Sequence, residues 1–374
     1  MERLRPARVV PPGIILRREI EARGWTQKDL AAIIGRPPQA ISEIIRGAKQ
    51  ITPETALELS EAFETSPEFW MNLETNYRLH LAEKQKDRKE IARKSELYSR
   101  IPVSELLRRG WIKAADSTER LEAEVSSFLG ISCLEDRLEL AVNFRHSDFR
   151  EPEYFAKLAW IRRVQHLAAM QRVEKFDPAK LERSLSALMS LSADETNVAR
   201  VPGLLLALGV HFVIVPHFSK TYIDGAMIPG INPTVALTLR HNRLDNFWFT
   251  LAHELAHILA GHERVRVDEE GLEKESADSD EATANAMARD WLLPLSEYRS
   301  FVARQRPYFS GDSIRRFALS QSRHASIVLG RLQHDGLVDY KNLRKFHVTV
   351  RESLRSLIDR PYSELQKDLP GQRG

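Results

Sequence analysis

Cysteine is almost absent from this chain of 374 residues, whose one thiol is Cys133. A single cysteine cannot form an intrachain disulfide or build a thiolate zinc cluster, so the sequence favours a reducing compartment. The most apolar stretch, residues 204–218, is interrupted by two histidines and a proline. It is also shorter than the roughly 18 residues that a membrane-spanning helix needs. Residues 1–13 lack the apolar core of a signal peptide, so we expect a cytoplasmic protein with no membrane partner.

The chain also lacks a strong net charge, which is only +3 and does not by itself indicate nucleic acid. The local distribution is more informative. Residues 1–53 hold ten Lys and Arg against five Asp and Glu, whereas residues 54–80 hold one against six. A basic segment followed by an acidic one indicates a local binding face near the N-terminus. The content of 43% apolar and 29% charged residues is that of an ordinary globular protein.

No internal repeat of solenoid length is present, and the patterning changes along the chain. Residues 14–195 show helical periodicity, including a highly charged stretch at 81–100. Residues 211–218 and 234–240 alternate like strands, and the Gly- and Pro-containing stretch 224–233 between them predicts turns around a short edge strand. Helices resume at about residue 246. The predicted fold class is therefore mainly α with a small β-sheet (α+β).

Two short helices joined by a tight turn are predicted within WTQKDLAAIIGRPPQAISEIIRG, residues 25–47. Thr26 and Asp29 have the spacing of a capping box at the first helix. Gly35 stands where a left-handed residue would end that helix, and Pro38 fits the first turn of the next. This pattern is typical of a helix-turn-helix whose second helix enters the major groove, although any small helical hairpin could share it.

On the helix-turn-helix interpretation, six polar side chains are candidates for DNA contacts. Gln39, Ser42 and Arg46 face outward from the second helix, where they could reach bases or backbone. The candidates for phosphate contacts are Gln27, Arg36 and Lys49.

Residues 11–80, which include ITPETAL (51–57) and EFWMNLE (68–74), resemble the HigA-like antitoxin branch of the lambda-repressor-like (XRE-type) DNA-binding fold. The resemblance implies a homodimer that binds double-stranded operator DNA, and it allows a cognate toxin as a further partner. A serine commonly caps the recognition helix in that family. Pro37 stands at this place here, so we expect that capping hydrogen bond to be absent.

The stretch FTLAHELAHILAGH, residues 249–262, contains an H-E-x-x-H pattern. His253 and His257 lie four apart on a predicted helix and therefore project from one face, where they can occupy two corners of a zinc site. Glu254 follows the first histidine and can serve as the general base of a metallopeptidase. The flanks are apolar on almost every other side, so this polar group would be buried and would need partners.

The third ligand is not decided by the pattern alone. The extended metzincin pattern is excluded, because Ala260 stands where it needs glycine and position 263 holds glutamate instead of histidine. Glu281 is favoured because it opens a helical, alanine-rich run, EATANAMARDWLLP, whose small residues allow close approach to the first helix. The alternatives are the neighbouring carboxylates Asp278 and Asp280 and, more weakly, His262.

WFTLAHELAHILAGH (248–262), followed by EATANAMARDWLLP (281–294), resembles the ImmA/IrrE family of metallopeptidases over about residues 200–340. The third zinc ligand of that family is the glutamate four residues before an Asn or Asp of the second motif. Asn285 marks that position, so the resemblance implies Glu281. DGA, residues 224–226, fits the same family and precedes the strand TVALTLR (234–240).

The resemblance implies a Zn²⁺ ion held by His253, His257 and Glu281, with Glu254 as the general base. A protein substrate could bind as an added strand along Asp224, Gly225 and Ala226. The electrophile that would stabilise the transition state is not identified by the sequence, which offers the following candidates: Tyr222, His217 and Tyr298.

The expected organisation is a helix-turn-helix domain at 1–80, a helical connector at 81–195, a zincin-like metallopeptidase domain at 196–345 and a polar tail at 346–374. The predicted function is a transcriptional regulator of antitoxin type that carries a zinc endopeptidase acting on a repressor-type protein. The alternative is a non-enzymatic repressor or antitoxin whose metal domain is a sensor or a structural module. The presence of Glu254 favours the enzyme, because a purely structural site does not need it.

Overall fold

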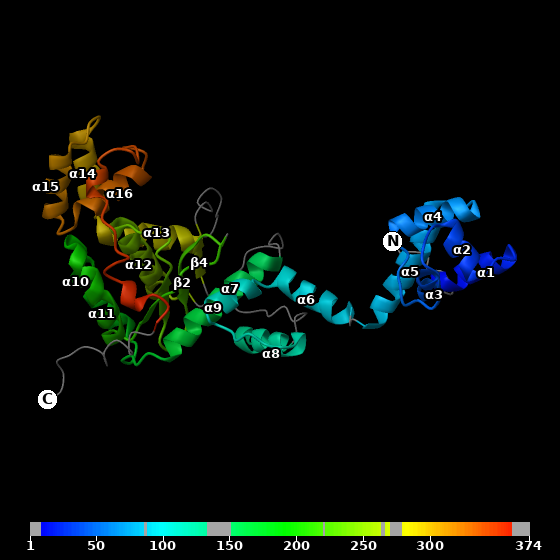
Figure 1. Ribbon diagram of the computed structural model, residues 1–374. Coiled ribbons are helices and arrows are strands. Elements are labelled where there is room, and N and C mark those ends of the chain that lie inside the picture. The colour runs from blue at the N-terminus through cyan, green and yellow to red at the C-terminus, as the bar shows by residue number, and fades with distance from the viewer. Residues whose placement is uncertain are drawn as a thin grey trace. The chain divides into compact units, whose positions relative to one another are not determined.

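The computed structural model describes residues 9–85, 88–132, 151–219, 221–262, 266–269 and 279–360. The chain divides into two compact units, Met1–Ser95 and Glu96–Gly374 (Figure 1). The first unit contains five helices in its described part. These are α1 (Pro12–Ala22), α2 (Gln27–Ile33), α3 (Pro38–Ile45), α4 (Pro53–Phe63) and α5 (Pro67–Gln85). Helix α6 (Arg88–Arg100) crosses the division between the units.

The helix-turn-helix prediction is confirmed at its turn and caps. The Asp29 backbone N–H donates to Thr26 Oγ1 at 3.2 Å, and the Thr26 backbone N–H donates to Asp29 Oδ2 at 2.7 Å. Gly35 is left-handed with φ +67° after α2. Helix α3 begins at Pro38, and Pro37 makes no side-chain capping bond, as expected. The apolar faces of these helices close around one core built by Leu16, Ile20, Leu30, Ile41, Ile44, Leu59, Phe63 and Trp70.

The second unit is built on a four-stranded sheet with the order β1-β3-β2-β4. The strands are β1 (His211–Ile214), β2 (Ile223–Ile228), β3 (Thr234–Leu237) and β4 (Arg266–Glu269). Strand β3 pairs parallel with β1 and antiparallel with β2, and β4 pairs antiparallel with β2. The expectation that β2 is an edge strand is therefore wrong. Strand β4 pairs along its open side, and the sequence pattern does not predict β4 because its residues lie in an acidic stretch.

Both faces of the sheet are covered, because alternate strand residues point to opposite sides. Phe212, Ile214, Val235 and Leu237 belong to one core, whereas Val213, Val215 and Ala236 belong to the other. The second core is closed by α6, α7 (Val103–Arg108), α8 (Thr118–Leu129) and α9 (Glu151–Ala169). The helices that were expected to form a separate connector thus share a core with the sheet.

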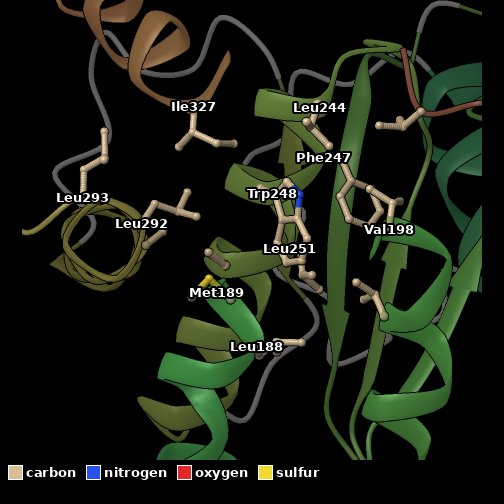
Figure 2. Close-up of a cluster of buried hydrophobic side chains, with 14 of the residues drawn as sticks. Leu188, Met189, Val198, Leu244, Phe247, Trp248, Leu251, Leu292, Leu293 and Ile327 are labelled. Carbon is tan, nitrogen blue, oxygen red and sulfur yellow. The ribbon is translucent and has the colours of Figure 1, made fainter. Parts of the chain in front are cut away.

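The other core surrounds α12 (Leu244–Leu259), as Figure 2 shows. Phe247, Trp248 and Leu251 of α12 lie among side chains from several other elements. These elements are α10 (Pro178–Ser190), α11 (Val201–Ala207), α13 (Ser279–Leu292), α14 (Leu295–Gln305), α15 (Gly311–Ser320) and α16 (Ala325–His334). A helix enclosed on so many sides holds its polar side chains in place through the surrounding packing.

The segment after α16 returns to this core. Phe346, Val350, Leu354 and Leu357 are buried in it, and Ile358 forms an isolated bridge with Ile214 of β1. The expected domain boundaries at 80, 195 and 345 stay predictions. Among the residues that the structure describes, no helix combines the length and apolar character required to cross a membrane.

Candidate metal centre

Three side chains from two helices converge at one buried point of the second unit. His253 and His257 project from α12, and Glu281 comes from the first turn of α13, which packs along α12 (Figure 1). Ala284 and Ala288 of α13 are fully buried, and their small size permits the close approach that the sequence indicated. Among the described residues, these three side chains form the one His, Cys, Asp and Glu group able to hold a metal ion, with ligand atoms within 4.8 Å of one another.

The spacing of the three donor atoms fits a tetrahedral ion. Glu281 Oε2 lies 3.3 Å from His253 Nε2 and 3.5 Å from His257 Nε2. Bonds of about 2.0–2.1 Å to a tetrahedral zinc place ligand atoms about 3.3–3.4 Å apart, so both distances match. The two Nε2 atoms are closer, at 2.9 Å, and need to separate by only a few tenths of an ångström to reach that spacing.

The electrostatics of the centre favour the protonation states that a metal needs. Burial lowers the pKa of His257, and the adjacent Glu281 only partly opposes this, so the imidazole is neutral. Burial raises the pKa of Glu281, but the hydrogen bonds from His253 and His257 outweigh it and hold that pKa well below its usual range. Neutral imidazoles and an ionised carboxylate are the forms that bind Zn²⁺.

Glu254 is completely buried between α12 and the sheet. It lies beside Gly225 of β2, since a Cβ atom placed on Gly225 would come within 2.8 Å of Glu254 Oε1 and 2.6 Å of Thr250 Cγ2. The absence of a side chain at Gly225 therefore leaves the room that the Glu254 carboxylate occupies. The pairing of β2 with β4 shifts register between Ile223 and Gly225.

A Gly225→Ala variant is expected to destabilise the second unit by about 1–3 kcal/mol, because the new methyl group overlaps Thr250 and the Glu254 carboxylate. Denaturant unfolding measures the loss. Adding Thr250→Ser removes the Cγ2 atom and should restore part of the stability. Gly311→Ala is a control without overlap, because no atom lies closer than 3.4 Å to its added Cβ. Equal losses in Gly225→Ala with and without Thr250→Ser would contradict this packing account.

The other two residues of the DGA motif have structural contacts. Asp224 accepts two hydrogen bonds of 2.8 Å from Arg240, from Nε and Nη2, and Ala226 is buried in the core beneath α9. Because β4 occupies the open side of β2, a substrate strand cannot add along Asp224–Ala226 unless it displaces β4. The substrate strand expected at Asp224, Gly225 and Ala226 stays a prediction, and it requires β4 to leave that side of β2.

The alternative ligands and the electrophile candidates have other surroundings. Asp278 lies outside the described residues, and Asp280 Oδ1 lies 3.6 Å from His262 Nε2. Tyr298 is packed in the core and donates to Asp335 at 2.7 Å. Burial and that hydrogen bond raise the pKa of Tyr298 well above its usual range. Its hydroxyl thus serves the contact between α14 and the end of α16.

Tyr222 is 56% exposed and has a left-handed backbone with φ +52° just before β2. His217 follows β1, and burial together with Arg240 and Arg109 lowers the pKa of its side chain. Neither residue is assigned as the electrophile.

In the first unit, the six candidate DNA contacts differ in how free their side chains are. Gln27, Arg46 and Lys49 are exposed. Gln39 is exposed and donates to Glu43 Oε1 at 2.9 Å within α3, and Ser42 is half-buried. Arg36 is also half-buried and forms a two-pronged ion pair with Glu58 of α4, with Nη2 at 3.0 Å from Oε1. The sequence offered no sign of this pair.

Comparisons with known proteins match both units. The helix-turn-helix family matches residues 16–70, and the IrrE N-terminal-like domain family of peptidase M78 matches residues 213–316. Virulence-associated protein I of Dichelobacter nodosus is 37% identical over 78 residues, which are 21% of this chain and 72% of that protein. The HTH-type transcriptional regulator YddM of Escherichia coli is 30% identical over 76 residues, 20% of this chain and 81% of that protein.

The chain belongs to the helix-turn-helix transcriptional regulators. Its second unit carries a peptidase M78 domain, and the matched range contains all three donors of the metal centre. Among solved structures, an addiction module antidote protein of the HigA family from Coxiella burnetii is 34% identical, covering 22% of this chain and 90% of that one, with a TM-score of 0.21. The antitoxin GraA is also 34% identical, covering 23% and 95%, with a TM-score of 0.22.

Proposed function

We propose that this regulator is an antitoxin-type, operator-binding protein whose second unit is a zinc-dependent endopeptidase acting on a repressor-type protein. The observation that supports the enzyme is the group of His253, His257 and Glu281, together with the buried Glu254 that follows His253 on the same helix. A structural metal site is closed by four protein ligands, whereas three ligands leave a position for water, as in catalytic zinc sites.

The three donors and Glu254 have separate roles in the proposed peptide hydrolysis. A zinc ion held by His253, His257 and Glu281 would supply Lewis-acid chemistry and would lower the pKa of water to about 7. Glu254 accepts the proton of the attacking water as the carbonyl carbon of the scissile peptide is attacked. It then passes that proton to the leaving amine nitrogen when the C–N bond breaks. Its burial keeps bulk water from competing for the carboxylate.

Zinc content and cleavage of the full-length protein test this proposal together. We expect elemental analysis to give one zinc per chain. We also expect the protein to cleave a repressor-type protein that is encoded near the gene for this chain. Mass spectrometry of the products measures that cleavage. A chelator should abolish cleavage, and added zinc should restore it. Absence of zinc after loading would overturn the metal centre. One zinc without cleavage of any neighbouring repressor would instead favour a sensor or structural module.

The operator proposal is supported by the confirmed helix-turn-helix and by the exposed side chains on and after α3. We propose that α3 reads double-stranded DNA from the major groove, and that two copies of the chain bind a palindromic operator upstream of its own gene. Sedimentation with and without that DNA tests the stoichiometry, and a complex with one chain per operator would contradict the dimer. A toxin encoded beside the gene is the further partner that co-purification would test.

Lys49→Ala and Gln39→Ala are expected to weaken DNA binding in different ways. Loss of a phosphate contact at Lys49 should lower affinity for all sequences and reduce the salt slope by about 0.9. Loss of Gln39 should instead reduce discrimination between operator and mutated operator by about 1–3 kcal/mol. Fluorescence anisotropy at several salt concentrations measures both. Arg18→Ala removes an exposed cation of α1 as the charge-matched control, and an equal loss there would contradict the assignment to α3.

Arg36 has a different role in this proposal from the one that the sequence suggested. Its guanidinium joins the turn between α2 and α3 to α4 through Glu58, and the ion pair raises the pKa of Arg36. We propose that the main role of Arg36 is to hold the turn before α3 against α4, and that phosphate contact is secondary. Arg36→Ala and Glu58→Ala should then weaken DNA binding similarly, whereas a phosphate role predicts a loss for Arg36→Ala alone.

A further inference from the structure

We propose that His262 is a positioning residue for the metal centre, because it fixes the ring orientation and the tautomer of His257. The inference rests on the proposed zinc site and adds a residue outside its three ligands. His262 Nδ1 lies 2.7 Å from His257 Nδ1, and the His262 side chain is only 11% exposed. The second ring nitrogen of His257 therefore has a specific protein partner.

The backbone turn that ends α12 places His262 over its own helix. Gly261 is left-handed with φ +70°, and its N–H donates to Ile258 O at 3.1 Å. The His262 N–H donates to His257 O at 3.2 Å, which completes a Schellman motif. Because this motif folds the chain back by one turn, His262 comes to lie beside His257, five residues earlier. Gly261 and His262, which follow the H-E-x-x-H helix, thus determine that the His262 imidazole lies beside His257.

Hydrogen-bond chemistry determines which nitrogen carries each proton. His257 Nε2 faces Glu281 and His253, so it must be unprotonated to bind a metal, and the hydrogen of the neutral ring is then on Nδ1. That N–H donates to His262 Nδ1, which must accept. His262 in turn carries its hydrogen on Nε2, which faces Asp280 Oδ1 at 3.6 Å. With a metal bound, this proton arrangement satisfies both ring nitrogens of His257, and the Asp280 carboxylate lies near the far nitrogen of His262.

This arrangement gives His262 a measurable effect on metal affinity. Partners of metal-bound histidines typically contribute 10–100-fold to affinity, because they hold the ring in the binding orientation and increase its basicity. His262→Ala should therefore raise the zinc Kd of the full-length protein by about 10–100-fold, measured by competition with a chromophoric chelator. His262→Asn should recover most of the affinity, because its Oδ1 replaces Nδ1 as the acceptor.

Cobalt substitution distinguishes a positioning residue from a direct ligand. At saturating Co²⁺, His262→Ala should show the visible spectrum of the wild type, because the coordinating atoms are unchanged. A changed spectrum would overturn the proposal and make His262 a ligand. An unchanged zinc Kd in His262→Ala, with wild type binding one zinc, would overturn it as well while leaving the metal centre intact. Failure of the wild type to bind zinc removes both proposals.

The turn itself has a matched control elsewhere in the second unit. Gly336, with φ +69°, ends α16 in the same motif, and neither Gly336 nor Gly261 has an atom within 4 Å of an added Cβ. Gly261→Ala and Gly336→Ala should thus cost similar stability from backbone strain alone. Only Gly261→Ala should weaken zinc binding, since only that turn holds His262. Equal zinc affinity in the two variants would contradict the link between the turn and the metal centre.

Discussion

A Glu254→Gln variant is expected to lose about 10²–10⁴-fold in kcat/KM for the protein substrate while it retains one zinc per chain. The amide has nearly the shape of the carboxylate, so the space beside Gly225 stays filled. It cannot accept the proton of the attacking water, and this is the step assigned to Glu254. The metal donors come from other side chains and are unaffected. Cleavage rates with measured zinc content check both halves of the prediction.

His253→Ala is the companion variant for this experiment, because it should lose zinc and cleavage together. If Glu254→Gln cleaves at the wild-type rate, Glu254 is not the base and the peptidase mechanism is wrong. If Glu254→Gln loses its zinc, the residue contributes to the metal centre more directly than its position indicates. Each result points to a different error, so the pair of variants separates chemistry from metal binding.

Glu281→Ala is expected to weaken zinc binding by more than about 100-fold, beyond the effect of an outer partner, because it removes one of the three ligands. Activity should disappear with the metal. The change also removes the anionic partner of two buried imidazoles, so the stability of the metal-free protein should change as well. Elemental analysis and chelator competition give the zinc Kd, and cleavage is measured on the same samples.

Glu297→Ala is the charge-matched control, since it removes an exposed carboxylate from α14. It should bind zinc like the wild type. Asp280→Asn tests the alternative third ligand and should cause a smaller loss than Glu281→Ala. If Asp280→Asn abolishes zinc binding and Glu281→Ala does not, the ligand assignment must move to Asp280.

Much of the first unit follows from local sequence signals. The capping box of Thr26 and Asp29, the left-handed Gly35 and the proline at the start of α3 act over a few residues, and all three appear in the structure as expected. The Arg36–Glu58 pair was not predictable from the same signals. Its partners lie 22 residues apart, and only the packing of α4 against the turn brings them together.

The edge strand shows where local reasoning fails. The Gly- and Pro-containing stretch around β2 gave no information on its neighbours, and β4 comes from an acidic stretch whose composition favours a solvated loop. Strand order depends on pairing between residues that are distant in the chain, which no local pattern contains. For that reason the local pattern around β2 predicted an edge strand, whereas the sheet has β2 at an inner position.

The sequence by itself determined the helix-turn-helix, the H-E-x-x-H helix and the residue types of a metal centre, because each depends on spacing along one or two helices. Only the tertiary structure decided that Glu281 of α13 meets the two histidines, that Gly225 makes room for Glu254, and that His262 turns back onto His257. These contacts join α12 to α13, to strand β2 and to the turn that follows α12. Close packing of the whole unit, not local periodicity, sets their distances.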